Sequence, residues 1–395
     1  MSAKKCTAFY SAAQAAFWML FCVAVSFAAV YLGGLGYTNS ELGALLALGS
    51  VLGFLSGTAL SAIIDRSGKL SASSLVWVVL TLQGIFYLVL LLHPERGMLT
   101  SVCYPLMHAS MLSVNTLNLR ICADFEHYKV SLNYGISRSM GSLFYTLISM
   151  VLGVFVTSLG IRIIPAVALG GTALQFLANA LLTAALTQLH CSEAAVEMPR
   201  VPVGRPLGEF LRENPKFCLL LIGSVLIFFA HNTTTTFLIN LVENVGGDTE
   251  AMGYLSAFGA MVEIPTMLLY SRIFRRKRCS WILGFAFIFF TIKSAALALA
   301  PNMPLLYAAE ALQAPSFAVY SPAIVAYVSL VVPYEDSAKG QSLAFGTTTV
   351  GGVIASLVSG HLYDILPVST VLWIAAAVCA VGTVIVLRSI EKTEV

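Results

Sequence analysis

Twelve apolar runs of about 20 residues, separated by short polar segments, constrain this chain more than any other feature. A helix needs roughly 20 apolar residues to cross about 30 Å of hydrocarbon, so each run is long enough to span a membrane. The runs lie near residues 10–32, 41–63, 73–92, 98–119, 134–159, 163–189, 217–241, 251–271, 280–300, 304–332, 340–362 and 367–388. The sequence therefore predicts an all-α polytopic membrane protein with twelve transmembrane helices.

The composition supports this prediction and excludes several other classes. Hydrophobic residues make up 58% of the chain and charged residues only 10%, whereas a soluble domain carries roughly 25% charged residues. Open sheet edges cannot be satisfied in lipid, which argues against strands. The net charge of +3 is too small to indicate a nucleic-acid partner. The first run is too long for a signal-peptide core, so we expect it to remain as a helix.

The distribution of lysine and arginine over the loops predicts how the chain is oriented in the membrane. Of the 22 such residues, Arg96 and Arg162 fall in loops on one side, Lys293 falls inside an apolar run, and the other 19 (22 − 3) fall on the opposite side. Cytoplasmic loops carry the excess of positive charge. We therefore expect a multi-pass protein of the plasma membrane, the bacterial inner membrane, with both termini in the cytoplasm.

A long polar stretch divides the chain into two halves. Residues 190–216 contain four prolines and read as a cytoplasmic linker between six-helix bundles at 1–189 and 217–395. A Gly-x5-Gly pattern begins at Gly135 and again at Gly340, an offset of 205 (340 − 135). This weak repetition predicts two related halves.

Several short segments carry a family resemblance. The segment Ser61–Lys69 resembles the loop signature between the second and third helices of the major facilitator superfamily. The segment Tyr134–Ser142 is similar to the fifth-helix signature of its lactose permease and phenylpropionate permease branch, as are parts of the second half around His231, Glu263–Pro265, Lys293, Pro315–Phe317 and Gly360–Asp364. The resemblance implies two six-helix pseudo-repeats, a substrate site between them and proton symport.

The chain also departs from that branch. The first glycine of the loop signature is Ser61 here, and the acidic residue often present in the fourth helix is Asn115. In the tenth helix the histidine and the proton-binding glutamate of the lactose permeases are replaced by Gln313 and Ser316. The resemblance therefore implies symport in general and not lactose-type chemistry.

Charged residues inside the apolar runs are the candidates for proton coupling. A charge at a helix centre costs roughly 2.5–3.5 kcal/mol on insertion scales, so each is a functional candidate. We rank Glu263 first and Glu310 second, with Lys293 and His231 as further candidates. Lys293 and Glu310 both lie roughly 10 Å below the outer surface, so an ion pair is expected. That pair is equally consistent with a structural role, and His231 with packing.

Helical spacing identifies the candidates for substrate binding, which share faces with other polar or aromatic residues. They are Gln14, Trp18, Asn115, Asn118, Arg138, Gln313, Tyr320 and Tyr327. In sugar permeases the arginine matching Arg138 contacts substrate, although it could instead anchor the helix end. The aromatic residues could simply pack. Asp65, Arg66 and Lys69 are predicted to gate or brace the cytoplasmic face.

The leading hypothesis is proton-coupled uptake of a small polar organic solute, such as a sugar, oligosaccharide or nucleoside. A singly anionic solute would use Arg138 or Lys293 as its counterion. One alternative is a drug- or metabolite-exporting antiporter, but the Gly-Pro motif of such exporters is missing between Gly141 and Gly153. Another is a non-transporting receptor or scaffold. The sequence contains no nucleophile–base pair, metal-ligand cluster or nucleotide-binding loop, so we expect neither an enzyme nor a cofactor or metal. We also expect a monomer.

Overall fold

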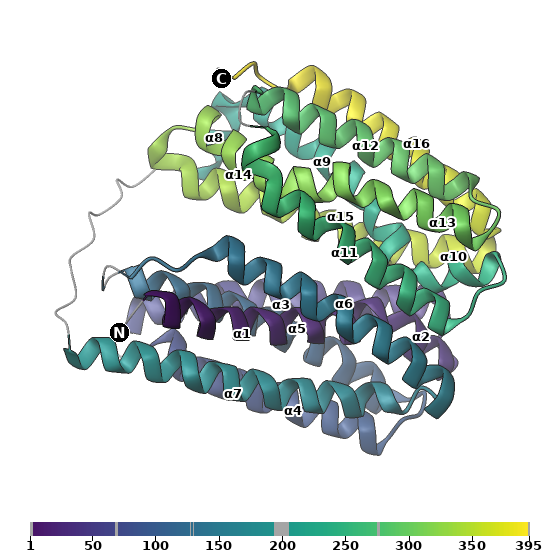
Figure 1. Cartoon of the computed structure of the whole chain (residues 1–395), viewed down its shortest axis with the longest axis horizontal. Helices are drawn as coiled ribbons and strands as arrows, with labels where there is room; N and C mark the ends of the chain where they lie inside the picture. Colours follow the sequence, from purple (N-terminus) through teal and green to yellow (C-terminus); the bar gives the residue numbers. More distant parts are fainter. Residues whose placement is uncertain are drawn as a thin grey trace. The chain divides into compact units, whose positions relative to one another are not determined.

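The computed structural model describes residues 3–67, 70–126, 128, 130–192, 205–274 and 277–393, and these residues form helices without a strand. The chain divides into two compact units, Met1–Pro199 and Arg200–Val395. The N-terminal unit contains α1 (Ala3–Phe21), a π-helical turn (Cys22–Ser26), α2 (Ala28–Gly34), α3 (Asn39–Ser67), α4 (Ala72–Leu92), α5 (Met98–Glu126), α6 (Tyr134–Leu159) and α7 (Ile163–Ser192) (Figure 1).

The C-terminal unit begins with the short helix α8 (Leu207–Glu213) and continues as a second bundle. Its helices are α9 (Pro215–Thr236), α10 (Leu238–Asn244), α11 (Thr249–Ile273), α12 (Cys279–Leu299), α13 (Met303–Glu310), α14 (Val319–Val331), α15 (Ser337–Ile365) and α16 (Val368–Ser389). A 3₁₀ turn (Ala311–Gln313) and a π turn (Ala314–Ala318) join α13 to α14, and a 3₁₀ turn (Tyr334–Asp336) precedes α15. Its apolar core gathers around Phe228, Phe290 and Tyr320.

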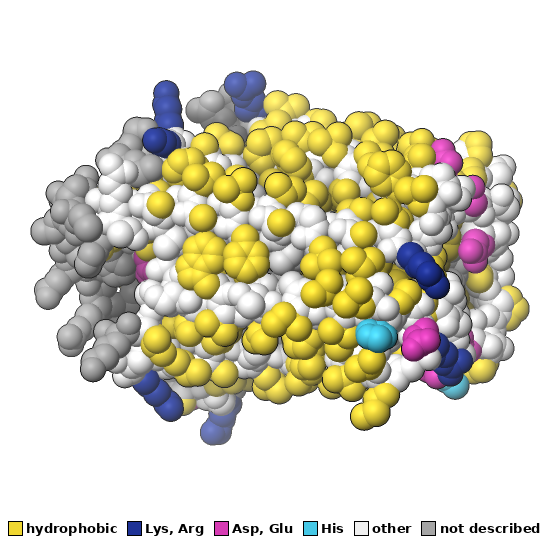
Figure 2. All heavy atoms as spheres, turned by 90° about the horizontal axis from the view of Figure 1, so that it is seen from below, with side chains coloured by type: hydrophobic (Ala, Val, Ile, Leu, Met, Phe, Trp, Pro, Cys, Tyr) yellow, Lys and Arg dark blue, Asp and Glu magenta, His cyan; other side chains and the backbone are white. Residues whose placement is uncertain are grey.

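Eleven helical segments in the described part of the chain are long and apolar enough to cross a membrane. The remaining predicted span is α5, whose 29 residues suffice in length but include His108, Asn115 and Asn118. The first span begins at Ala3, earlier than the predicted residue 10. The face seen in Figure 2 is covered by apolar side chains, with lysines and arginines toward its two ends. The prediction of an all-α polytopic membrane protein is confirmed.

Matched irregularities reveal a repeat that is more exact than the glycine pattern in the sequence. The first span ends in the seven-residue helix α2 and the seventh in the seven-residue helix α10. Each is followed by a glycine with positive φ, Gly36 at 89° and Gly246 at 82°. Their offset is 210 (246 − 36), and the same offset (315 − 105) relates Pro105 within α5 to Pro315 in the tenth span. The two bundles therefore carry a short terminal helix in their first spans and a proline in their fourth spans at equivalent positions.

Small residues allow α3 and α5 to pack closely in the N-terminal unit. The facing pairs are Gly49 with His108, Gly53 with Leu112 and Gly57 with Thr116. A Cβ atom at Gly53 would lie 2.7 Å from Leu112 Cδ1 and 3.3 Å from the Ala109 Cα atom. This small-xxx-small spacing is typical of helix contacts in membranes, where packing replaces the hydrophobic effect.

We predict opposite effects on stability for two glycine substitutions. Gly53→Ala should lower the thermal unfolding midpoint in detergent, because overpacking costs about 1–3 kcal/mol. Gly170→Ala in α7 should leave it unchanged or raise it, since no atom lies within 4 Å of the added Cβ and alanine favours helix by about 1 kcal/mol. A Gly53→Ala protein at least as stable as the Gly170→Ala protein would contradict this account of the α3–α5 contact.

Candidate functional site

A continuous chain of four polar side chains crosses the interior of the C-terminal unit. The Lys293 ammonium donates to Glu310 Oε1 at 2.8 Å and to Gln313 Oε1 at 2.6 Å. The Gln313 amide then donates through Nε2 to Glu263 Oε1 at 2.8 Å. All four residues are at least 92% buried, with Glu310 the most exposed at 8%. The expected Lys293–Glu310 ion pair is present, and we call the four residues the buried relay.

Irregular backbone in the tenth span brings two relay residues to the same lysine. In a 3₁₀ turn, side chains at i and i+3 lie directly above one another. The turn Ala311–Gln313 therefore aligns Gln313 with Glu310 on the side facing Lys293 of α12. Pro315 cannot continue regular α-helical hydrogen bonding, and the π turn that contains it follows at once. The regular spacing used in the sequence prediction does not apply across this segment.

Gly259 of α11 makes room for the Glu310 carboxylate. A Cβ atom at this position would lie 2.6 Å from Glu310 Oε1. Gly259 precedes Glu263 by one helical turn, so the backbone of α11 lies against one carboxylate and its side chain supplies the other. The sequence prediction missed Gly259, although a glycine four residues before a buried glutamate was the available signal.

The charges of the buried relay do not cancel when all its groups are ionised. It contains two carboxylates and one ammonium, so its formal charge would be −1. Burying a net charge is expensive, and a single added proton makes the relay neutral. Glu310 contacts the ammonium directly, whereas Glu263 reaches it through the neutral amide of Gln313.

The other predicted residues of the C-terminal unit lie among aromatic rings. His231 stacks on Phe317 with ring centroids 5.5 Å apart and meets the Phe290 ring edge-on at the same distance. Tyr320 is 2% exposed within the same core. The Tyr327 hydroxyl accepts a hydrogen bond from the Glu391 backbone. Both tyrosines belong to the apolar core of this unit.

Two predicted substrate-binding residues meet in the N-terminal unit. The Arg138 guanidinium carbon lies 3.9 Å from the centroid of the Trp18 ring, a cation–π contact. Arg138 also donates to Ser142 Oγ at 2.9 Å. The indole lies against Gly141, where a Cβ atom would overlap its Cδ1 atom. The structure thus joins Trp18 and Arg138 into one aromatic–cationic pair.

The remaining polar candidates of this unit are buried to different degrees. Gln14 is 2% exposed and donates to the Tyr10 hydroxyl at 2.9 Å. Asn115 of α5 is half-buried. Asn118, one turn further along α5, is fully buried and its amide has no hydrogen-bond partner among the described residues.

The predicted gating residues lie where α3 ends. Asp65 forms an ion pair with Arg120 of α5, so it braces two helices of the same unit. Arg66 is exposed, and Lys69 lies outside the described residues. A second cluster, which the sequence prediction missed, surrounds Asp336 before α15.

The buried Asp336 carboxylate ties the start of the C-terminal unit to α15. It accepts from the Arg205 backbone and Nε, both at 3.0 Å, and from the Lys339 ammonium at 2.7 Å. The hydrogen bond from Arg205 to this carboxylate raises the pKa of the guanidinium above its ordinary value. Arg205 therefore stays charged and fixes the chain entering α8.

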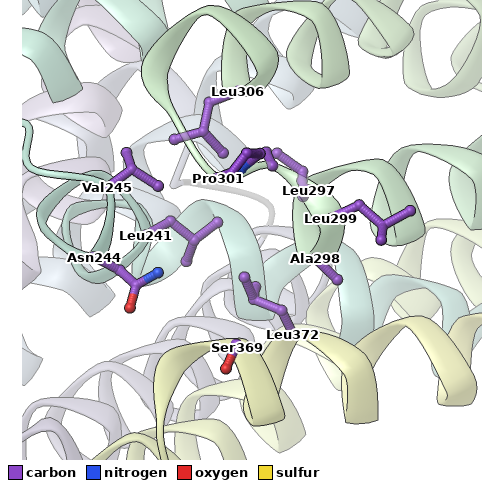
Figure 3. Close-up of a pocket in the computed structure, with 11 residues that line it drawn as sticks. Leu241, Asn244, Val245, Leu297, Ala298, Leu299, Pro301, Leu306, Ser369 and Leu372 are labelled. Carbon is purple, nitrogen blue, oxygen red and sulfur yellow. The ribbon is translucent and has the colours of Figure 1, made fainter.

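A small cavity of about 220 Å³ lies at one end of the C-terminal unit (Figure 3). Its lining is mostly apolar and includes Leu241, Leu297, Leu306 and Leu372. No relay residue lines it, although Leu297 follows Lys293 by one turn and Leu306 precedes Glu310 by one turn. The cavity therefore lies beside the buried relay and does not contain it.

We predict that removing Lys293 destabilises the protein more than removing its whole ion pair. Lys293→Met leaves a buried carboxylate without its ammonium, which costs roughly 3–5 kcal/mol. Thermal unfolding in detergent measures this loss.

The matched control is the double variant Lys293→Met/Glu310→Gln. It contains no carboxylate at position 310 and should recover stability relative to Lys293→Met. A double variant no more stable than the single variant would show that the buried carboxylate at position 310 is not what destabilises Lys293→Met.

Comparisons with known proteins identify relatives of this chain. The sequence profile of the MFS_1 like family matches residues 10–373. A protein of Deinococcus radiodurans named "Putative sugar efflux transporter" is 28% identical over 147 residues, and the match covers 37% of this chain and 38% of that protein. The chain thus matches well under half of that relative's length.

Solved structures share the fold at low sequence identity. The crystal structure of nucleoside transporter NupG is similar with a TM-score of 0.75 and 14% identity, covering 99% of this chain and 100% of that one. An auto-inhibited POT family peptide transporter is similar with a TM-score of 0.70 and 11% identity, covering 97% and 96%. These likenesses show the fold, and the family match over nearly the whole chain shows that the protein belongs to the MFS_1 like family of major facilitator transporters.

Proposed function

We propose that this multi-pass membrane transporter couples the uptake of a small polar organic solute to the movement of protons, with the buried relay as the coupling element. The observation that carries the proposal is that one buried hydrogen-bonded chain contains two carboxylates and a single lysine, with Lys293 on Glu310 directly and on Glu263 through Gln313. A group that binds one proton when closed and releases it when water enters is what symport requires. Glu263 is the residue that takes up the proton, and Glu310 holds Lys293 in place.

The membrane potential supplies free energy that such coupling can use for uptake. One charge moved across 100 mV supplies about 2.3 kcal/mol. For a neutral solute this sustains roughly a 50-fold gradient, since 1.4 kcal/mol corresponds to a factor of ten. The excess of lysine and arginine on one side of the chain supports cytoplasmic termini in a bacterial inner membrane, and a monomer suffices for this mechanism.

The Trp18–Arg138 pair is the proposed solute contact of the N-terminal unit. An aromatic face with an attached cation suits a sugar ring, a nucleobase or a planar anion. The buried amides of Gln14 and Asn118 are neutral hydrogen-bonding groups suited to hydroxyls. The name of the Deinococcus relative refers to sugars and that of the structural neighbour to nucleosides, which supports a solute of this class.

We predict that Glu263→Gln abolishes solute-driven proton movement in proteoliposomes. Sugars, nucleosides and aromatic acids are added outside, and the external pH is recorded for the wild type and the variant. The wild type should alkalinise the outside when its solute is added, and Glu263→Gln should not, because its amide cannot carry a proton. Glu243→Gln, which changes an exposed carboxylate at the end of α10, is the control and should behave as the wild type. Uptake without proton movement in all three proteins would overturn the proposal.

Export by proton antiport is the second candidate function, favoured by the printed name of the Deinococcus relative. The same recording distinguishes the two directions of coupling. Symport moves the proton inward with the added solute and alkalinises the outside, whereas antiport sends the proton outward and acidifies it. Acidification that disappears in Glu263→Gln would keep the relay as the coupling element and replace uptake by export.

We predict that Arg138→Gln weakens solute binding by about tenfold, measured as KM in the same vesicles. Loss of a partly desolvated cation–π pair and its hydrogen bond is worth about 1–2 kcal/mol. Arg162→Gln removes an exposed arginine beyond the end of α6 and should leave KM unchanged. Equal KM values for the two variants would assign Arg138 to anchoring the helix end.

A further inference from the structure

An open groove runs along α1 on the N-terminal unit, separate from the Trp18–Arg138 pair. Its cavity measures about 900 Å³, and every residue that lines it belongs to this unit. The floor consists of small side chains of α1, Ala8, Ala12, Ala15 and Ala16. The walls consist of large apolar side chains of α6 and α7, including Met140, Phe144, Leu174, Leu177 and Leu181.

The depth of the groove follows from this difference in side-chain size. Alanines in successive turns of α1 leave a trough that the longer side chains of α6 and α7 do not fill. Leu174 and Leu177 remain 49% and 59% exposed, and Ala8 and Ala12 are exposed on the floor. The groove is therefore apolar surface that the N-terminal unit does not cover with its own side chains.

The groove changes character along its length. Lys4, Thr7, Ser131 and Asn133 line one end, whereas the other end near Met19 is apolar. No acidic residue is among those that line it. Along α1, Lys4 and Met19 are separated by 15 residues (19 − 4), which is about 22 Å. One leaflet with its headgroup region contributes about half of a bilayer that is roughly 40–45 Å thick, so the groove has the length of one leaflet with a basic end at the headgroup level.

We propose that this groove binds an acyl chain of an anionic phospholipid, whose phosphate meets the Lys4 ammonium. The apolar walls receive the chain, while the hydroxyls of Thr7 and Ser131 lie at the level of the glycerol esters. A basic end on the side of the chain where lysine and arginine predominate matches the anionic surface of the cytoplasmic leaflet. The site does not depend on the proposed direction or coupling of transport.

The test uses a phosphatidylglycerol and a phosphatidylcholine that each carry a photoreactive group on the acyl chain. Each lipid is mixed into nanodiscs with the full-length protein, and labelled peptides are identified by mass spectrometry. Labelling by phosphatidylglycerol should concentrate on the α1, α6 and α7 segments that line the groove. Ala12→Phe fills the floor and should abolish this labelling, while Ala180→Phe, at an exposed position of α7 outside the groove, should not.

Charge reversal at the open end keeps the test independent of folding. Lys4 is exposed, so Lys4→Glu should fold normally and reduce labelling by phosphatidylglycerol at least about fivefold, because each lysine near an anionic surface contributes about 1 kcal/mol. Labelling by phosphatidylcholine should change little. Equal labelling of the groove in the wild type, Ala12→Phe and Lys4→Glu would overturn the proposal, as would protection of the groove by a second copy of the chain or by a transported solute.

Discussion

Two carboxylates and one ammonium lie out of water in the C-terminal unit, and the rest of the site depends on how their charges are balanced. Lys293 holds Glu310 directly and reaches Glu263 only through the amide of Gln313. A buried net charge is expensive, so the proposed proton would offset the second carboxylate. The same imbalance would be a liability in a purely structural ion pair and would be useful in the proposed coupling device.

The backbone around this network is irregular where the chemistry needs it to be. A 3₁₀ turn aligns Glu310 with Gln313, and the π turn at Pro315 follows. The equivalent proline of the first half, Pro105, lies within a continuous helix. The two halves therefore share a plan, but in the described residues only the second interrupts the regular α-helix of its fourth span with 3₁₀ and π turns, next to its charged residues. π-helical turns inside helices are frequent at functional sites.

The sequence was sufficient to predict the helical fold, the order of the membrane spans and the Lys293–Glu310 pair. The length and hydropathy of each apolar run determine how deep in the membrane a residue lies. It was not sufficient to predict the role of Gln313, which was grouped with substrate-binding residues on the assumption of a regular helix. Gly259 was missed because its importance is the absence of a side chain beside Glu310. Tyr327 was predicted as a candidate for substrate binding, and its hydroxyl accepts a hydrogen bond from the Glu391 backbone. These contacts depend on tertiary packing, which hydropathy does not report.

Infrared spectroscopy of the reconstituted protein tests most directly whether the buried relay holds a proton. A protonated carboxylic acid has a C=O stretching band that is separate from the bands of carboxylates, and it shifts when solvent hydrogen is exchanged for deuterium. At neutral pH the wild type should show this band, Glu263→Gln should lack it, and Glu310→Gln should lose it as well, because Lys293 then has a single carboxylate to neutralise and Glu263 no longer needs a proton. A wild-type spectrum without the band, or a band that persists unchanged in Glu263→Gln, would contradict the account.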